Sequence, residues 1–349
     1  METAVVFKIG TIAVAAFAVA LILTPLVTHF LFKYKMGKQI RDAKSAPIFS
    51  KLHGEKAGTP TMGGIIIWLT VALLALGISA IVKTTDSSFF EKFNFLTRAQ
   101  TLLPLGALLF AAIIGLIDDF MGVKKIGPHG GGLSMAIKLA TYSLIAAVCA
   151  AWFYFKLDWD TVHVPFFGNF EIGWWFLPLS FFVIVATAFS VNETDGLDGL
   201  VGGILICCFA AIGAIAFSEG KFELATFCAA IIGASIAFLW FNIYPAKFFM
   251  GDTGAMSLGI VLAVLALYTN TILLLPIIGI IFVIETLSVI IQLSSKKLRG
   301  KKIFLSSPIH HHLQALGWNE PRIVMRFWLI SGIAAVLGVI LFLLDKGWY

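Results

Sequence analysis

Acidic and histidine side chains gather at the ends of the apolar stretches of this 349-residue chain. Adjacent carboxylates resist ionising together unless a cation compensates them, so neighbouring aspartates favour a metal-binding or proton-transfer role. Several carboxylates with few cysteines favour a hard cation such as Mg²⁺, which is bound by oxygens and by substrate phosphates. The clusters are Asp118-Asp119, Asn192–Gly199 with Asp195 and Asp198, Gly251–Gly254 with Asp252, and His310–His312.

Each cluster also has a plainer structural interpretation when it is taken alone. The paired aspartates could follow a membrane span and face water, and the glycines around Asp195 and Asp198 could form an ordinary turn. Asp252 opens an apolar stretch and could be a helix N-cap. Three consecutive histidines could be a solvated surface run. All four clusters fall on one side of the membrane topology predicted below, which favours a common site.

A further stretch on the same side is suited to bind phosphate. Lys56 supplies a cation, and Gly58–Gly64 (GTPTMGG) is a glycine-rich turn whose backbone amides can approach an anion. Phosphoryl transfer depends mainly on positioning and charge neutralisation, and these residues provide both. At the membrane face, a cytosolic phosphate compound can meet a lipid. The residues therefore predict a Mg²⁺-dependent transferase that acts on a lipid phosphate.

The composition places the elements that carry these residues in a membrane. Hydrophobic residues make up 59% of the chain and charged residues 13%, and the mean hydropathy is +0.96. A soluble domain is about a quarter charged and under half apolar, so the apolar excess must face lipid. We expect an all-α polytopic membrane protein whose residues 1–349 form a single domain. The formal charge of +6 belongs to the loops and does not indicate a nucleic-acid partner.

Ten stretches approach the roughly 20 apolar residues that a transmembrane helix needs. Residues 252–293 are almost continuously apolar, but one helix of that length would measure roughly 60 Å, about twice the hydrocarbon thickness. We divide this stretch at 269–271 (Thr-Asn-Thr), with Pro276 just beyond. The predicted spans are 9–32, 62–82, 100–117, 133–155, 173–191, 199–218, 222–241, 252–269, 271–293 and 325–344.

The positions of the basic residues support this division and orient the chain. With ten spans, and with Arg326 assigned to the loop before the last span, 17 of the 25 Lys and Arg fall on one side. Seven fall in the opposite loops and the termini, and Lys138 lies within a span. The positive-inside rule then places the 17 in the cytoplasm and both termini outside. Joining 252–293 into one helix would move the basic stretch 294–324 outside. The predicted active site therefore lies on the cytoplasmic face.

The clusters resemble the motifs of the phospho-N-acetylmuramoyl-pentapeptide transferases, within the polyprenyl-phosphate N-acetylhexosamine-1-phosphate transferase superfamily. The resemblance covers essentially the whole chain. Paired aspartates and the GDTG turn are shared across the superfamily, whereas Pro308–His312 (PIHHH) followed by Gly317-Trp318 and Pro321-Arg322 points to the muramoyl-pentapeptide branch. The matching stretches are Gly58–Gly64, Asp118-Asp119, Asn192–Gly199, Asn242–Gly254, Glu285–Gln292 and Pro308–His312.

This resemblance implies an activity and its partners. Phospho-N-acetylmuramoyl-pentapeptide would pass from UDP-N-acetylmuramoyl-pentapeptide to undecaprenyl phosphate, giving lipid I and UMP in the first membrane step of peptidoglycan synthesis. Mg²⁺ is the implied cofactor. The implied form is a homodimer in the bacterial cytoplasmic membrane, with ten spans and outward termini.

The resemblance also implies roles for individual residues. Asp252 matches the Mg²⁺ ligand, and Asp118 matches the carboxylate that deprotonates the lipid phosphate, with Asp119 beside it. Phe249 matches the aromatic ring that stacks on uracil. The other implied substrate-binding residues are Lys56, Thr61, Asn192, Asp195, Asp198, Asn242 and Gln292; His310 and His311 match the histidines nearest the substrate, and His312 is either a further contact or structural.

Two positions depart from the family pattern. Glu193 stands where Asn-Leu-Thr-Asp-Gly would have an apolar residue, and Gly122 stands where we expect a lysine. An extra carboxylate near a uridine diphosphate adds repulsion unless it is paired or turned away. Glu285, within a span, is either a helix-packing residue or a support for the site.

Two other functions fit parts of the pattern. A sister enzyme that transfers N-acetylglucosamine-1-phosphate would share the aspartates but lack PIHHH. A secondary transporter could also have ten spans and intramembrane acids, but transporters bind near the membrane midplane, whereas these candidates lie at one face. The sequence leaves open the third residue of the pentapeptide. It also leaves open whether transfer is direct or passes through a covalent aspartyl intermediate.

Overall fold

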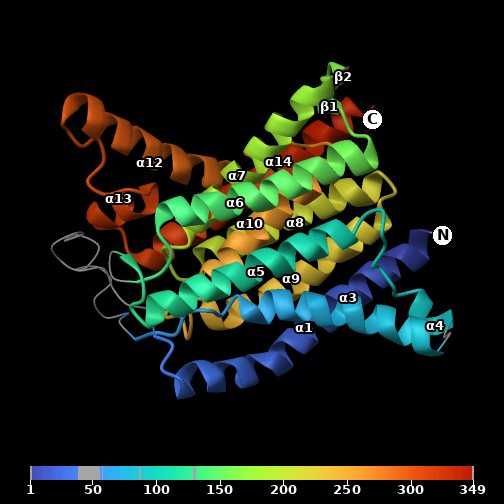
Figure 1. The fold of residues 1–349 in the computed structure, drawn as a ribbon, viewed down its shortest axis with the longest axis horizontal. Coiled ribbons are helices and arrows are strands. Elements are labelled where there is room, and N and C mark those ends of the chain that lie inside the picture. The colour runs from blue at the N-terminus through green and yellow to red at the C-terminus, as the bar shows by residue number, and fades with distance from the viewer. Residues whose placement is uncertain (1, 38–55, 57, 86–87, 129–130, 348–349) are drawn as a thin grey trace.

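The computed structural model describes residues 2–37, 56, 58–85, 88–128 and 131–347. These ranges are mostly helical, and the long helices run side by side in one bundle (Figure 1), which confirms the predicted class. The helices are α1 (Glu2–Lys33), α3 (Ile65–Thr85), α4 (Ser88–Glu91), α5 (Leu102–Val123), α6 (Met135–Ala151), α7 (Phe176–Thr194), α8 (Leu200–Ser218), α9 (Phe222–Asn242), α10 (Asp252–Tyr268), α11 (Leu275–Ile278), α12 (Ile280–Arg299), α13 (Ile309–Ala315) and α14 (Glu320–Asp345), with a π-helical turn at Trp152–Lys156 and a 3₁₀ turn at Gly173–Trp175.

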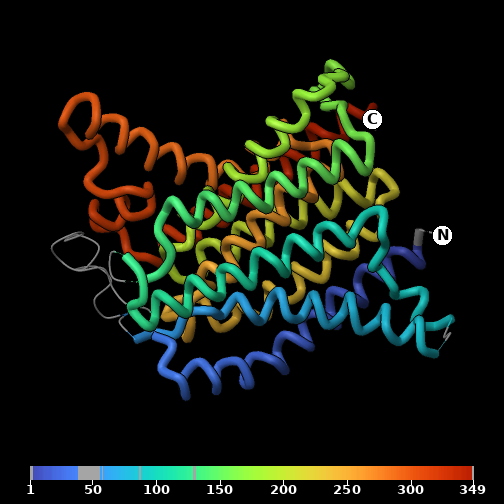
Figure 2. Tube along the Cα trace, in the orientation of Figure 1, coloured from blue at the N-terminus to red at the C-terminus, as the bar shows by residue number. Residues whose placement is uncertain are grey.

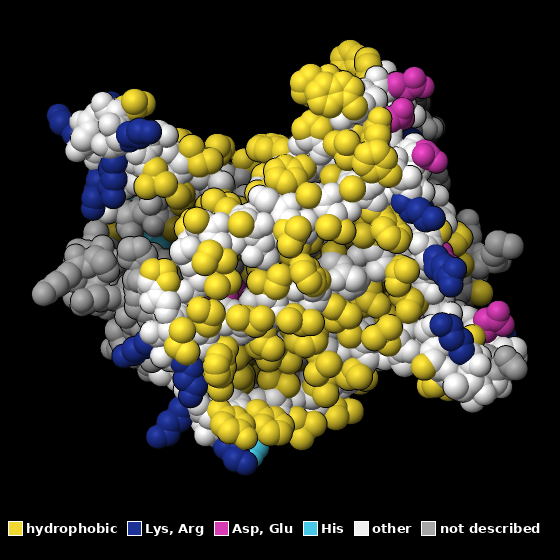
Figure 3. All heavy atoms as spheres, viewed as in Figure 1, with side chains coloured by type: hydrophobic (Ala, Val, Ile, Leu, Met, Phe, Trp, Pro, Cys, Tyr) yellow, Lys and Arg dark blue, Asp and Glu magenta, His cyan; other side chains and the backbone are white. Residues whose placement is uncertain are grey.

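Eight helices of the described chain are long and apolar enough to cross a membrane. They are α1, α3, α5, α6 with its π-helical turn, α7 with its 3₁₀ turn, α8, α9 and α14. A broad apolar band covers the face in Figure 3, with charged side chains at its two ends, as a membrane-embedded bundle requires. α10 is apolar but has 17 residues, and α12 carries three basic residues in its last turn. The predicted total of ten therefore depends on these two helices.

The helix boundaries confirm one prediction and correct another. α10 ends at Tyr268 and α11 begins at Leu275, so the apolar stretch is divided where predicted. The span predicted to end at 117 is different, because α5 continues to Val123. Asp118 and Asp119 therefore lie within a helix and not in the loop that follows it. Hydropathy marks the end of the apolar run, whereas the helix ends where its backbone hydrogen bonds stop.

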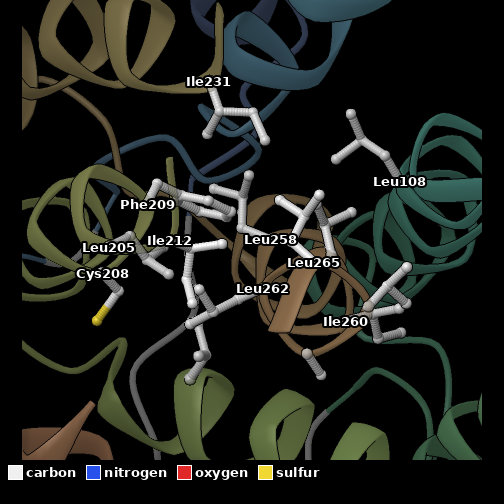
Figure 4. Packing of buried hydrophobic residues seen from close by; sticks show 14 of the residues in the cluster. Leu108, Leu205, Cys208, Phe209, Ile212, Ile231, Leu258, Ile260, Leu262 and Leu265 are labelled. Atoms are coloured by element: carbon white, nitrogen blue, oxygen red, sulfur yellow. The ribbon is translucent and has the colours of Figure 1, made fainter. Parts of the chain in front are cut away.

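α10 forms the centre of the bundle. Every residue from Thr253 to Tyr268 is buried. In Figure 4 leucines of α10 face Phe209 and Ile212 of α8, while Leu108 of α5 lies on another side. Glycine permits the close approach of α5, because a Cβ at Gly115 would lie 2.5 Å from the backbone oxygen of Asp252. Small residues at such crossings allow helices to pack closely in membranes.

A hairpin that the sequence did not predict lies beside the C-terminal end of the chain, at the end of the bundle where the N and C labels stand (Figure 1). Strands β1 (Thr161–Val164) and β2 (Gly168–Glu171) pair antiparallel, with Thr161 opposite Glu171. Asp345, at the end of α14, accepts a hydrogen bond from the backbone of Phe166 at 2.5 Å and contacts His163. The hairpin is thereby fastened to the last helix.

At the opposite end, α12 leaves the bundle. Figure 2 shows its tube diverging from those of its neighbours toward the short helix α13. Glu285, in the part of α12 nearer the bundle, is fully buried, whereas Leu298 near its end is 82% exposed. This arrangement brings the start of α13, with its histidines, beside the loops between the long helices.

Candidate active site

A lysine of α6 joins the carboxylates of two other helices. Lys138 Nζ lies 2.6 Å from Asp118 Oδ2 of α5 and also contacts Asp252 Oδ2 of α10. Ser134 positions this turn of α6 as its N-cap, accepting from the backbone of Ile137. The other Asp118 oxygen accepts from the backbone N–H of Leu133. One ammonium thus shares its charge between two carboxylates, which need such compensation to be close together.

Asp119 caps α10, although it belongs to α5. Its two carboxylate oxygens accept from the backbone N–H groups of Asp252 and Thr253, at 3.2 and 3.1 Å. Thr61 Oγ1 donates to the same carboxylate at 3.3 Å. The N-cap position of α10 is occupied by Gly251, whose φ of 74° suits glycine. Because another residue satisfies these amides, the interpretation of Asp252 as a mere N-cap is wrong, and its carboxylate faces Lys138.

The loop after α7 supports the start of α10. Asn192 Nδ2 donates to Asp252 Oδ1 at 3.1 Å. Asp195 Oδ2 accepts from the backbone N–H of Gly251 at 3.2 Å. The predicted convergence of these two clusters is therefore correct, and Asp195 contributes by fixing the glycine turn.

A second cation is held beside this loop by two acids. Lys56 Nζ lies 2.6 Å from Asp198 Oδ1 and 2.6 Å from Glu320 Oε1. Asp198 also accepts from the backbone of Ala246 at 3.0 Å. Its own backbone N–H donates to Glu320 at 2.6 Å. Lys56 is thus placed between the loop after α7 and the first turn of α14.

Phe249, the ring predicted to stack on uracil, lies next to Lys56. Its Nζ is 5.9 Å from the centre of the Phe249 ring and 5.8 Å from that of Tyr244. Asn242 is buried, and its amide accepts from the backbone of Gly199 and donates to the carbonyl of Phe248. Asn242 therefore shapes the turn that presents the neighbouring Phe249.

His310 and Glu285 form a buried pair at the same end. His310 Nδ1 lies 2.9 Å from Glu285 Oε2, and neither side chain is exposed. Burial lowers the pKa of His310 to about 3, so its ring is neutral at physiological pH. Its Nε2 lies against Gly196 and has no hydrogen-bond partner among the described residues. Glu285 is thereby assigned to supporting a histidine of the predicted site.

The two neighbouring histidines have different surroundings. The His311 ring centre lies 4.1 Å from that of His310, and its Nδ1 is 2.9 Å from Gln314 Oε1. His312 Nδ1 accepts from the backbone of Leu305 at 3.2 Å. The structure thus gives His312 a structural contact, in accord with one of the two roles expected for it.

Gln292 has a similar structural environment. Its Oε1 accepts from the backbones of Ile303 and Phe304, both at 3.0 Å, and its Nε2 donates to the Phe304 carbonyl at 2.8 Å. The side chain is buried and holds the segment between α12 and α13. A direct contact with substrate stays a prediction for this residue.

Sequence reasoning missed Lys138 and Glu320. Lys138 lies within the predicted span 133–155, where a lone cation at membrane depth marks function by default. Glu320 precedes the apolar run of α14, and no spacing rule links it to Lys56, which lies 264 residues earlier. Lys138 had a usable signal, whereas Glu320 could be found only from the fold.

Comparison with known proteins gives a consistent match. The family model of glycosyl transferase family 4 matches residues 101–270, and signature 1 of phospho-N-acetylmuramoyl-pentapeptide-transferase matches residues 56–67. Proteins with the latter name include one from Shouchella clausii, 42% identical over 335 residues that cover 94% of this chain and 95% of the relative. The relative from Chloroflexus aggregans is 38% identical over 346 residues, which cover 95% of this chain and 89% of the relative. The relative from Bacillus subtilis is 37% identical over 340 residues, which cover 97% of this chain and 98% of the relative.

Proposed function

This chain belongs to the phospho-N-acetylmuramoyl-pentapeptide transferase family, and on that premise we propose how its site works. It is a multi-pass membrane enzyme with phospho-N-acetylmuramoyl-pentapeptide transferase activity. The comparisons support this activity and not the two alternatives, an N-acetylglucosamine-1-phosphate transferase and a secondary transporter. Its substrates are UDP-N-acetylmuramoyl-pentapeptide and undecaprenyl phosphate, and its products are lipid I and UMP. It acts as a homodimer in the bacterial cytoplasmic membrane.

The proposed topology has ten spans with both termini outside. The described chain begins and ends at the hairpin end of the bundle (Figure 1), which supports an even number of crossings. α10 begins with Asp252 at the carboxylate site and ends with Tyr268, whose ring lies 4.7 Å from that of Phe153, near the hairpin. α14 begins with Glu320 at Lys56, which supports a return of the chain through α12. The basic loops orient the site end toward the cytoplasm.

The observation that carries the mechanism is the shared contact of Lys138 with Asp118 and Asp252. Two carboxylates from different helices are brought to one place that already accommodates a positive charge. Leu133 and Lys138 fix the orientation of the Asp118 carboxylate. In the proposed reaction Asp118 accepts the proton of the lipid phosphate, whose oxygen then attacks the β-phosphorus of the donor. The bond between that phosphorus and the bridging oxygen breaks, and the oxygen leaves as part of UMP. Lys138 stabilises the negative charge that gathers on the phosphate oxygens.

The donor set fits Mg²⁺. Mg²⁺ is usually bound through one or two carboxylates together with substrate phosphates, and Asp252, with Asp118 beside it, offers that number. No group of three or more His, Cys, Asp or Glu that could hold a metal occurs within the described ranges, so the substrate phosphates would complete the coordination. When bound, the ion would neutralise charge on the diphosphate of the donor.

The remaining residues position the nucleotide and the sugar phosphate. Phe249 provides an aromatic face for uracil, with Lys56 above it as a donor to phosphate oxygens. Asp198 and Glu320 hold Lys56 in place. Neutral His310, oriented by Glu285, presents Nε2 at the loop that contains Gly196. These contacts stabilise charge and orientation, which phosphoryl transfer mainly requires.

Release of UMP tests the proposed function. The purified chain with UDP-N-acetylmuramoyl-pentapeptide, undecaprenyl phosphate and Mg²⁺ should release UMP and form lipid I. Replacing the donor with UDP-N-acetylglucosamine should abolish release, and activity with that donor alone would contradict the proposal. UMP release without the lipid phosphate would identify a covalent enzyme intermediate, whereas direct attack requires both substrates.

A further inference from the structure

An open pocket of about 490 Å³ lies between the end of α1 and the turn that follows α9. None of its lining residues belongs to the carboxylate site. Pro25, Phe32 and Phe241 provide apolar walls, and His29, Lys33 and Lys247 add polar and basic groups. The pocket therefore combines a surface suited to hydrocarbon with groups suited to an anion.

The two lysines of this pocket are available to a ligand. Lys33 Nζ lies 5.9 Å from the centre of the Tyr34 ring, and Lys247 Nζ lies 5.2 Å from that of Phe241. Within the described part of the chain neither lysine forms an ion pair, and no acidic residue lines the pocket. Its charge is therefore uncompensated by the protein residues that the structure places there.

The position of the pocket matches the boundary between hydrocarbon and lipid headgroups. Lys33 is the last residue of α1, and Phe241 is the penultimate residue of α9, both of which are long enough to span a membrane. In Figure 3 basic side chains border the apolar band at the end of the molecule where Figure 1 shows α1 ending. By the charge bias of the loops, this end faces the cytoplasm.

We propose that the pocket binds an anionic phospholipid of the cytoplasmic leaflet. The lipid phosphate lies between Lys33 and Lys247, and its acyl chain runs along Phe32 and Phe241. Basic residues at the membrane surface attract anionic lipids, and the apolar walls add contact that a soluble phosphate could not use. A zwitterionic phosphatidylcholine binds more weakly, because its choline group places a positive charge near the same lysines.

Native mass spectrometry of the full chain in detergent tests this assignment. The probes are dioleoyl phosphatidylglycerol and dioleoyl phosphatidylcholine, each titrated to measure the Kd of the first bound lipid. The Lys33→Gln/Lys247→Gln variant should bind phosphatidylglycerol about tenfold more weakly (about 1.4 kcal/mol) and phosphatidylcholine as before. The Lys33→Arg/Lys247→Arg variant should keep the wild-type Kd, which separates lost charge from misfolding.

The matched control removes two lysines from the projecting tip of α12. Lys296→Gln/Lys297→Gln changes the net charge by the same amount, and the Kd for phosphatidylglycerol should stay within twofold of wild type. An equal loss in this control, or no loss in the pocket variant, overturns the proposal. Displacement of phosphatidylglycerol by millimolar glycerol phosphate also overturns it, because the pocket would then bind a soluble anion.

Discussion

Asp252→Asn separates a metal-binding role from a structural one. With both carboxylates ionised, Asp118, Lys138 and Asp252 bring two negative charges and one positive charge together. With asparagine at position 252, Asp118 and Lys138 remain as an ion pair that has no net charge. The asparagine keeps a carbonyl oxygen that can accept a hydrogen bond from Asn192. Because an excess charge in a partly buried cluster is unfavourable, the variant should fold. Its thermal midpoint without Mg²⁺ should lie within about 3 °C of wild type, roughly 1 kcal/mol.

The chemical effect of the same substitution should be much larger. A neutral amide is a weaker ligand, so the variant loses charge stabilisation that is worth several kcal/mol in the transition state. We expect kcat to fall at least about a hundredfold, which corresponds to roughly 2.7 kcal/mol. UMP release at saturating substrates, measured over a Mg²⁺ titration, gives kcat and the apparent affinity for the metal.

Asp119→Ala provides the opposite pattern as a control. Its carboxylate accepts from two backbone amides at the start of α10, so its removal should cost about 0.5–2 kcal/mol of stability. The thermal midpoint should fall, while the apparent affinity for Mg²⁺ should change little. Near-wild-type turnover of Asp252→Asn at ordinary Mg²⁺ would refute the reasoning and move the proposed metal to Asp118.

Three further substitutions test the neighbouring groups. Lys138→Met leaves two carboxylates without their cation and should destabilise the chain by up to about 3–5 kcal/mol. Thermal melts should show that Mg²⁺ stabilises this variant more than it stabilises wild type. Equal stabilisation would contradict the role of Lys138 in compensating both carboxylates. Burial lowers the pKa of His310 in the folded chain to about 3, below the value of 6.5 for the same histidine in the unfolded chain. The stability that the neutral His310 ring contributes is therefore present above pH 6.5 and is lost as pH falls toward 3. Between pH 7.5 and 5.5, melting curves should show that the free energy of unfolding falls by about 1.4 kcal/mol less in His310→Gln than in wild type. Equal falls in the two proteins would contradict this role of His310. Gln292→Ala removes three hydrogen bonds to residues 303–304 and should lower the thermal midpoint more than it raises the KM for the donor; the reverse result would favour direct substrate binding.

Composition and charge predicted much of the fold because a membrane restricts the available structures. Backbone groups in lipid must be satisfied internally, so long apolar runs become helices. The polar residues at 269–271 correctly placed a break in the longest run. Neither rule addresses residues outside the membrane, and the β1–β2 hairpin was missed for that reason. Its attachment to Asp345 depends on a contact between segments 179 residues apart.

Motifs located the candidate site but did not assign the roles of its individual residues. The sequence correctly brought Asp118, Asn192 and Asp252 to one end of the bundle. It did not predict that Lys138 joins two of them, because a single lysine within an apolar stretch forms no motif. Gln292 matched a family segment, but hydrogen bonds to residues 303–304 occupy its amide.

The paired aspartates show why spacing alone could not assign these roles. The sequence placed Asp118 and Asp119 in a loop, where neighbouring carboxylates could both face one cation. α5 instead continues through them to Val123, and successive residues of an α-helix point about 100° apart because 3.6 residues complete a turn. Asp118 therefore meets Lys138, while Asp119 meets the first amides of α10. Asp118 is therefore left for the proposed chemistry, and Asp119 fixes the start of the helix that carries Asp252.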